Sequence, residues 1–226
     1  MKICILTSSY PLNILDSKAA AGLFVRDFAI ELAKVDHQVY IFTQAREGDI
    51  EDDLELKVVR FNWNGGEKPL ARLNPLNPKE LIPIISLMRN GKRSFFKLIM
   101  EEKIDYCLVM WAFPSGYFAF QAYKECNIPY AIWSLGSDVW TLGRYPIMRW
   151  FLKRIFRNAK ALFADGNDLA REVMRISGKE CKFLPSTRNL PVNEIEAADI
   201  NRDLKNFLFI GRWGKKTKGL TFLLRQ

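Results

Sequence analysis

Short apolar runs alternate with amphipathic stretches along most of this chain. The apolar runs Lys2–Ser8 and Val39–Thr43 lie on either side of Leu23–Lys34, in which apolar residues recur every three or four positions. That spacing predicts a helix packed on a sheet, whereas the two continuous runs predict buried strands. A strand, a helix and a strand in this order form the crossover unit of a parallel sheet. The alternation therefore predicts an α/β fold with a parallel sheet flanked by helices.

The same alternation continues as far as Leu184. Further strands are expected at 54–61, 105–110, 130–135, 161–164 and 181–184, and further helices at 80–89, 92–102, 115–125, 146–158 and 167–176. Between them, Asn62–Lys79 contains three prolines and four asparagines, which predicts a long irregular loop. These elements together make up a first domain at residues 1–185.

One strand end in this domain has the composition of a ligand site. The run Tyr130–Leu135 is apolar, which predicts a strand buried on both faces, and it stops at Gly136, Ser137 and Asp138. Because ligands of open α/β sheets bind at the carboxyl ends of the strands, these three residues are candidates for the wall of a cleft. The alternative is an ordinary turn with a solvated Asp138.

Positive charge is concentrated in one part of the sequence. The chain has a formal net charge of +9, and Val139–Ala164 contains no acidic residue. The basic residues of this segment are Arg144, Arg149, Lys153, Arg154, Arg157 and Lys160. Such a local patch attracts phosphates, nucleic acid or anionic lipid, whereas a charge that serves only solubility would be spread evenly.

The expected helix at 146–158 carries much of this charge. Arg149, Lys153 and Arg157 recur at helical spacing, and Trp150 lies on their flank. Basic and aromatic residues together are typical of helices that rest on an anionic membrane. These four residues are therefore candidates for membrane contact, and a solvated basic face is the alternative.

Several classes of protein are disfavoured by what the sequence lacks. No apolar run approaches the roughly 20 residues of a spanning helix, and the chain leads straight into its first strand, so a cytoplasmic protein is expected. If the basic helix binds lipid, the protein is expected to be peripheral at the inner face of the cell membrane. The first loop carries no Gly-x-Gly-x-x-Gly, which argues against a dehydrogenase. His37 is the only histidine, so a Ser-His-Asp hydrolase would lack its base. The four cysteines are too widely spaced for a zinc site and are expected to be buried thiols.

The end of the chain differs in composition from the rest. Residues 186–205 are polar and irregular, which indicates a linker, and Asn206–Ile210 predicts a new strand that is followed by a basic turn and the start of a helix. A domain of one strand and half a helix cannot bury a core. Residues 206–226 are therefore expected to be the start of a truncated second domain, or else a piece that packs on the first.

Three stretches, taken in order, resemble a known family. Gly22 followed by LFVRDFAIELAKVDHQVYIFT, then WAFPSGYFAFQAYKECNIPYAIWSLGSDV, then NFLFIGRWGKKTKG, resemble the family 4 (group 1) glycosyltransferases of the GT-B fold. The resemblance covers the N-terminal Rossmann-like domain, the linker and the first strand and turn of the C-terminal domain. It implies a retaining hexosyltransferase that moves a sugar from a nucleotide-sugar donor to a saccharide or lipid-linked acceptor in cell-envelope or exopolysaccharide synthesis, with no cofactor and no required metal.

The resemblance also implies roles for individual residues. Gly22 matches a first-loop glycine that approaches the donor diphosphate, where N–H groups at a helix N-terminus supply the anion site. Arg212 and Lys218 match a basic turn that neutralises the leaving diphosphate. Gly136–Asp138 matches the end of a His-Gly-Ser-Asp stretch, but Leu135 stands where many members have histidine. No residue is assigned as catalytic.

Other readings of the chain stay open. The C-terminal half of such an enzyme is absent from the sequence, so the chain alone is expected to be inactive, either as a fragment or as half of a split enzyme that a partner chain completes. A non-catalytic basic module that binds an anionic membrane or nucleic acid is the alternative from another class. Nucleic acid is the less favoured partner because the sequence contains no RNA- or DNA-binding motif.

Overall fold

Seven parallel strands form the centre of the molecule. The computed structural model describes residues 1–13, 16, 22–48, 56–66 and 77–187. Within these residues the strands lie in the order β3-β2-β1-β4-β5-β6-β7. Their bounds are β1 Lys2–Leu6, β2 Gln38–Gln44, β3 Lys57–Phe61, β4 Tyr106–Met110, β5 Tyr130–Ser134, β6 Ala161–Ala164 and β7 Lys182–Phe183. The predicted parallel α/β sheet is therefore confirmed.

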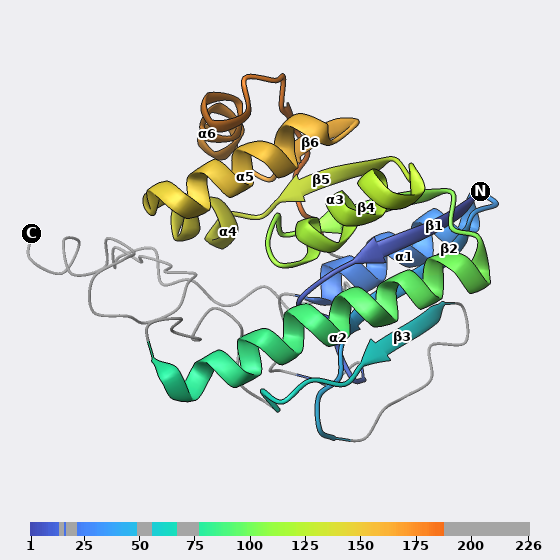
Figure 1. Ribbon diagram of the computed structural model, residues 1–226. Helices are drawn as coiled ribbons and strands as arrows, with labels where there is room; N and C mark the ends of the chain where they lie inside the picture. The colour runs from blue at the N-terminus through green and yellow to red at the C-terminus, as the bar shows by residue number, and fades with distance from the viewer. Residues whose placement is uncertain (14–15, 17–21, 49–55, 67–76, 188–226) are drawn as a thin grey trace, which may run out of the picture. The chain divides into compact units, whose positions relative to one another are not determined.

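Helices cover both faces of this sheet (Figure 1). On one face lies α1 (Leu23–Lys34), and on the other lie α2 (Pro78–Glu102), α3 (Ser115–Cys126), α5 (Pro146–Asn158) and α6 (Asn167–Ser177). Two short helices, α4 (Ser137–Trp140) and the 3₁₀ helix η3 (Leu142–Arg144), follow β5. Because each long helix follows a parallel strand, each begins at the carboxyl edge of the sheet and ends at the amino edge.

Core side chains form two layers, one on each face of the sheet, because the side chains along each strand alternate between the two faces. On β1, Ile5 packs towards α1, whereas Cys4 and Leu6 pack towards the side of α2 and α3, because successive side chains of a strand point to opposite faces. β5 is buried along its whole length, as its apolar run predicts. Aromatic rings fill the layer on the side of α2 and α3, where Phe42 stacks on Phe61 with ring centroids 5.0 Å apart. Both layers anchor helices whose N-terminal ends reach the carboxyl edge.

A single helix, α2, replaces the two helices that were expected at 80–89 and 92–102. It begins at Pro78, where the Asn77 side chain accepts a hydrogen bond of 3.1 Å from the Lys79 N–H. It continues through Gly91, which is buried, and a Cβ atom on this residue would lie 2.5 Å from the Phe118 ring of α3. The glycine therefore lets the two helices pack closely and does not break α2.

Several other predicted elements differ at their ends. β3 begins at Lys57, and residues 54–55 of the longer predicted strand lie outside the described part of the chain. The segment after β5, for which the sequence predicted no helix before Pro146, contains α4 and η3. Three cysteines are buried free thiols, as predicted, but Cys126 is only half-buried. Apart from residues 186 and 187, the predicted linker and the predicted elements at 206–226 also lie outside the described residues.

Candidate functional site

The strand order places a topological switch point between β1 and β4. The chain leaves β1 towards β2 and leaves β4 towards β5, so the connections diverge on either side of this pair of strands. In open α/β sheets, ligands bind outside the carboxyl ends of the strands at such a point. The loops that follow Leu6 and Met110 therefore form the candidate site.

Gly22 lies at this edge, at the N-terminal end of α1. The residue is buried, and a Cβ atom on it would lie 2.5 Å from the Ser9 carbonyl oxygen and 3.0 Å from the Tyr10 Cα, so only glycine fits without a shift of the backbone. Among the described residues, no side chain caps α1, and its first turn carries no acidic residue. The first-turn N–H groups of such a helix attract anions. This helix end is therefore suited to hold a phosphate group.

Hydrogen bonds hold the loop after β1 against the sheet. The Thr7 hydroxyl donates to the Ser9 carbonyl oxygen at 2.9 Å and accepts the Ser9 N–H at 3.1 Å. At the end of β2, the Gln44 amide donates to the Ser8 carbonyl oxygen at 2.7 Å. Side chains at two strand ends thus fix the backbone that approaches Gly22.

Two arginines hold the next part of this loop, and reasoning from the sequence missed both. Arg46, after β2, forms an ion pair with Asp16, whose carboxylate also accepts the Leu12 N–H at 3.0 Å. Arg60, on β3, donates to the Pro11 carbonyl oxygen at 2.7 Å. A basic residue inside the otherwise apolar end of β3 is the signal that could have identified Arg60.

A second helix begins beside the switch point. Trp111 follows β4 directly and has a φ of 62°, in the left-handed region, and its ring lies 6.1 Å from that of Phe24 on α1. α3 then begins at Ser115, again with no side-chain cap in the described part of the chain. The loop after β4 and the N-terminal ends of α1 and α3 therefore share one edge of the sheet.

Asp138 holds the loop after β4 from the neighbouring strand. Its side chain is buried, with 3% of the residue exposed, and Oδ2 accepts the Ala112 N–H at 2.7 Å. Burial raises the pKa of Asp138 above its ordinary value of 3.8, and the surrounding backbone N–H groups, led by that of Ala112, only partly counter this effect. The carboxylate is therefore a positioning group, and the alternative of a solvated Asp138 is wrong.

The other predicted cleft-wall residues lie on the connection after β5, one strand away from the switch point. Gly136 has a φ of 105°, a conformation that favours glycine, and Ser137 is exposed. Leu135 is half-buried and packs with the core layer on the α1 side. The structure thus joins Gly136–Asp138 to the candidate site through the hydrogen bond to Ala112.

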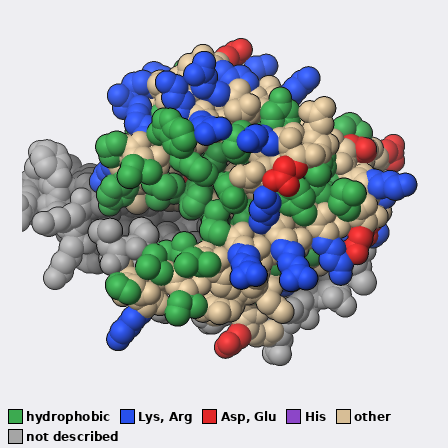
Figure 2. Space-filling model, viewed as in Figure 1, with side chains coloured by type: hydrophobic (Ala, Val, Ile, Leu, Met, Phe, Trp, Pro, Cys, Tyr) green, Lys and Arg blue, Asp and Glu red, His purple; other side chains and the backbone are tan. Residues whose placement is uncertain are grey.

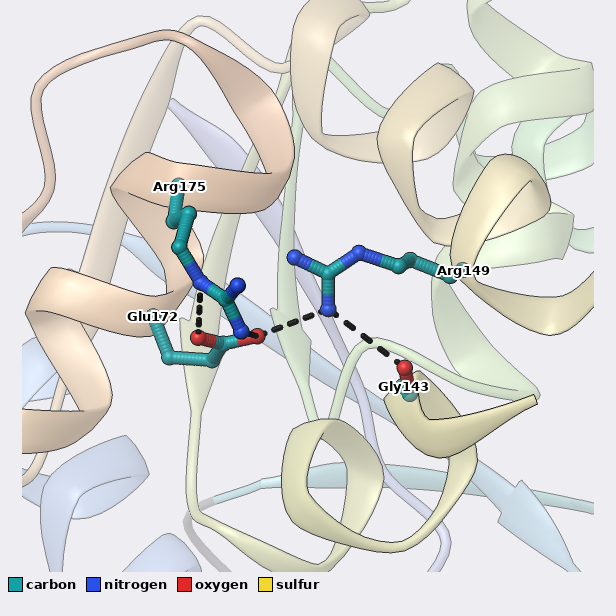
Figure 3. Close-up of polar contacts among 4 residues, drawn as sticks. All are labelled: Gly143, Arg149, Glu172 and Arg175. Atoms are coloured by element: carbon teal, nitrogen blue, oxygen red, sulfur yellow. Dashed lines mark hydrogen bonds and ion pairs between the residues drawn. The ribbon is translucent and has the colours of Figure 1, made fainter. Parts of the chain in front are cut away.

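Of the four predicted membrane-contact residues on α5, one turns towards α6. Arg149 donates to Glu172 at 2.8 Å and to the Gly143 carbonyl oxygen at 3.4 Å, and Arg175 binds the same carboxylate (Figure 3). Burial opposes ionisation of Glu172, but the hydrogen bonds from Arg175 and Arg149 outweigh it and lower the pKa of this residue. Arg149 therefore joins α5 to α6. The helical spacing of the basic residues on α5 could not predict a partner on another helix.

The outer side of α5 is divided along its length. At the start, Tyr145, Ile147 and Trp150 are 62%, 81% and 57% exposed, and towards the end the exposed side chains of Lys153 and Arg157 follow. Figure 2 shows Lys and Arg side chains gathered over α5 and α6, with hydrophobic side chains beside them. Apolar groups at the start of this exposed helix face are thus followed by cationic groups, and the Arg154 guanidinium lies 5.1 Å from the centre of the Trp150 ring.

The described residues hold neither a cluster of metal ligands nor a membrane-spanning helix. No group of three or more His, Cys, Asp or Glu side chains there could hold a metal ion, and no helix among them is long and apolar enough to cross a membrane. Arg212 and Lys218 lie outside the described residues. Their role at the leaving diphosphate therefore stays a prediction.

Comparison with known proteins finds likeness in structure but not in sequence. No family model matches the chain, and no curated protein matches it. A sucrose-phosphate synthase of Thermosynechococcus elongatus is similar, with 15% identity and a TM-score of 0.58 over 84% of this chain and 91% of that one. HepE of Anabaena is similar in its complexes with UDP-glucose (14% identity) and with UDP and glucose (13% identity), each with a TM-score of 0.53. Both HepE matches cover 84% of this chain but only 44% and 45% of the HepE chains, so this chain spans less than half of their length. These likenesses establish a Rossmann-like fold of the kind found in those proteins.

Proposed function

We propose that this chain is the acceptor-side domain of a family 4 glycosyltransferase of the GT-B fold. The enzyme transfers a hexose from a nucleotide-sugar donor to a saccharide or lipid-linked acceptor in cell-envelope or exopolysaccharide synthesis, with retention of the anomeric configuration. The observation that carries this proposal is the likeness over 84% of the chain to HepE in complex with UDP-glucose. Three stretches that resemble the family support it from the sequence.

The proposed chemistry uses the N-terminal end of α1. Its N–H groups, which Gly22 allows close to the loop after β1, face the diphosphate of the donor. Arg212 and Lys218 add positive charge as negative charge develops on the leaving nucleoside diphosphate. These cations do the work that a metal ion does in other phosphate chemistry, so the scheme includes neither a metal nor a cofactor.

We also propose that the start of α5 rests on an anionic membrane, where a lipid-linked acceptor is found. The exposed Ile147 and Trp150 lie at the end of α5 that reaches the carboxyl edge, and Lys153 and Arg157 follow on the same helix. An apolar contact with adjacent cations matches a membrane interface. This contact would bring an acceptor to the edge that holds the switch point.

Release of nucleoside diphosphate tests the transfer reaction. Together with the protein encoded directly downstream, the chain should release UDP, GDP or ADP from one member of a panel of nucleotide sugars, and release should increase when a lipid extract supplies acceptors. If the chain alone is inactive, adding the protein encoded directly downstream should restore release when the enzyme is split. The anomeric configuration of the product, determined by NMR, checks retention.

Failure of this assay has a definite meaning. No release from any donor, with or without the downstream protein, would contradict the enzyme and leave the non-catalytic basic module as the better description. Transfer with inverted configuration would support a glycosyltransferase but contradict the family 4 assignment.

Vesicle flotation tests the membrane contact. Ile147→Ser combined with Trp150→Ser should weaken binding to phosphatidylglycerol vesicles about tenfold or more, because burial of each large apolar side chain stabilises the bound state by about 1.5–3 kcal/mol. Val35→Ser combined with Met100→Ser is the control, since these side chains are also exposed, at 60% and 69%, but lie at the amino edge. Equal binding by both double variants would refute a contact through the start of α5.

A further inference from the structure

A hollow lies between α5 and α6 at the amino edge of the sheet, opposite the edge that holds the candidate site. Its volume is about 420 Å³, within the range of about 300–1,000 Å³ that is usual for small-molecule sites. It is lined by Lys153, Arg157, Arg175, Ile176, Ser177, Gly178 and Lys179. Four of these seven residues have cationic side chains, so the lining favours an anion.

Two of the four cations are already engaged within the protein. Arg175 pairs with Glu172 at 2.7 Å. Lys179 donates to the carbonyl oxygens of Ala159 and, at 3.4 Å, Arg157, and so satisfies the last turn of α5. The positive charge of Lys179 therefore offsets the negative C-terminal end of the α5 dipole beside the hollow.

Lys153 and Arg157 are the other two cations of the lining. Lys153 and Arg157 have no ion-pair partner within the described part of the chain, and no acidic side chain is part of the hollow's lining. They lie four residues apart on α5, a spacing at which like charges repel and destabilise a helix. An anion with two negative charges between them would remove this repulsion and gain charge-assisted hydrogen bonds.

We infer that this hollow binds a phosphate group carried by an organic molecule, either a soluble metabolite or a lipid head group, through Lys153 and Arg157. A phosphate matches the two unpaired cations in charge, and the guanidinium of Arg157 can bind it with two parallel hydrogen bonds. The remaining volume and the polar lining accommodate the organic part. This site is separate from the switch point, and it does not depend on sugar transfer.

Calorimetric titration and vesicle flotation test the site on the whole chain. Glycerol 3-phosphate is the soluble probe, and phosphatidic acid in phosphatidylcholine vesicles is the lipid probe. Lys153→Gln combined with Arg157→Gln should weaken binding of the responding probe at least about tenfold, because hydrogen bonds to charged groups contribute about that factor each. Arg93→Gln combined with Lys97→Gln is the matched control, because it removes two cations at the same spacing from the exposed face of α2.

Each outcome decides between alternatives. Binding of glycerol 3-phosphate that only the α5 variant loses supports the site and a soluble ligand. Loss with phosphatidic acid vesicles but not with phosphatidylglycerol vesicles, which report the general membrane contact of α5, supports the site and a lipid ligand. Equal weakening by the α2 control would show general attraction to the basic surface and overturn the proposal, as would binding of neither probe to the wild type. An inactive chain in the sugar-release assay affects none of these results.

Discussion

Asp138→Ala is expected to lower the free energy of unfolding by about 2–3 kcal/mol. The substitution removes the acceptor of the Ala112 N–H and leaves this buried donor without a partner, which costs about 1–3 kcal/mol in addition to the lost packing. Urea denaturation followed by tryptophan fluorescence measures the total, and amide exchange at Ala112 reports the loop itself. Asp168→Ala is the control, because that carboxylate is 81% exposed and its loss should change stability by no more than about 0.5 kcal/mol.

Asp138→Asn separates the hydrogen bond from the charge. Asparagine keeps an oxygen for the Ala112 N–H, so this variant should be more stable than Asp138→Ala. Because the pKa of Asp138 is raised in the folded chain, the folded state binds more protons than the unfolded state above pH 3.8, and ionisation of Asp138 disfavours folding as the pH rises. Asp138→Asn should therefore gain stability relative to the wild type from below pH 3.8 towards neutrality. A difference that does not change with pH would contradict a raised pKa.

Gly22→Ala is expected to affect both stability and the proposed reaction. The new Cβ would lie 2.5 Å from the Ser9 carbonyl oxygen, a backbone atom that cannot rotate away, so the loop or α1 must shift. Overpacking of this kind costs about 1–3 kcal/mol. A shift of the N–H groups relative to a donor diphosphate should also lower the rate of nucleotide release on the order of tenfold to a hundredfold.

Gly166→Ala is the matched control for this substitution. Gly166 also precedes the first residue of a helix, α6, but it has no atom within 4 Å of a built Cβ, and its φ of −155° is open to any residue. Any general cost of alanine at a helix N-terminus is therefore common to both variants. If the two variants lose equal stability, the close approach of Ser9 to Gly22 has no special importance.

Local patterns predicted the fold well because strands and helices are set by neighbours in the sequence. The apolar run at Tyr130–Leu135 and the periodicity of Leu23–Lys34 both identified their elements. The predicted break in α2 falls at residues 90–91, and the role of Gly91 there depends on Phe118 of another helix. A glycine in a helical pattern can end the helix or allow another helix to pack closely, and only the tertiary structure distinguishes these two roles.

The site was less predictable because its contacts join distant parts of the chain. Gly22 was identified by its match to a first-loop glycine of the family that the sequence resembles, but the Ser9 backbone that makes a glycine necessary becomes visible only in three dimensions. The Asp138 carboxylate accepts a hydrogen bond from a residue 26 positions away, and Arg149 binds a carboxylate 23 positions away. No periodicity in the sequence reports pairs at such separations.

The central place of β1 has a consequence for how the chain is made. β1 leaves the ribosome before the other described strands, and it pairs with β2 on one side, whereas Lys2 on its other side bonds to Asp105, 103 residues away. At about 5–20 residues per second, the segment between β2 and β4 takes on the order of 3–12 s to synthesise. Throughout that interval one edge of β1 is open, and open strand edges pair readily with other chains. The growing polypeptide should therefore be most prone to aggregate, and most in need of a chaperone, before β4 emerges.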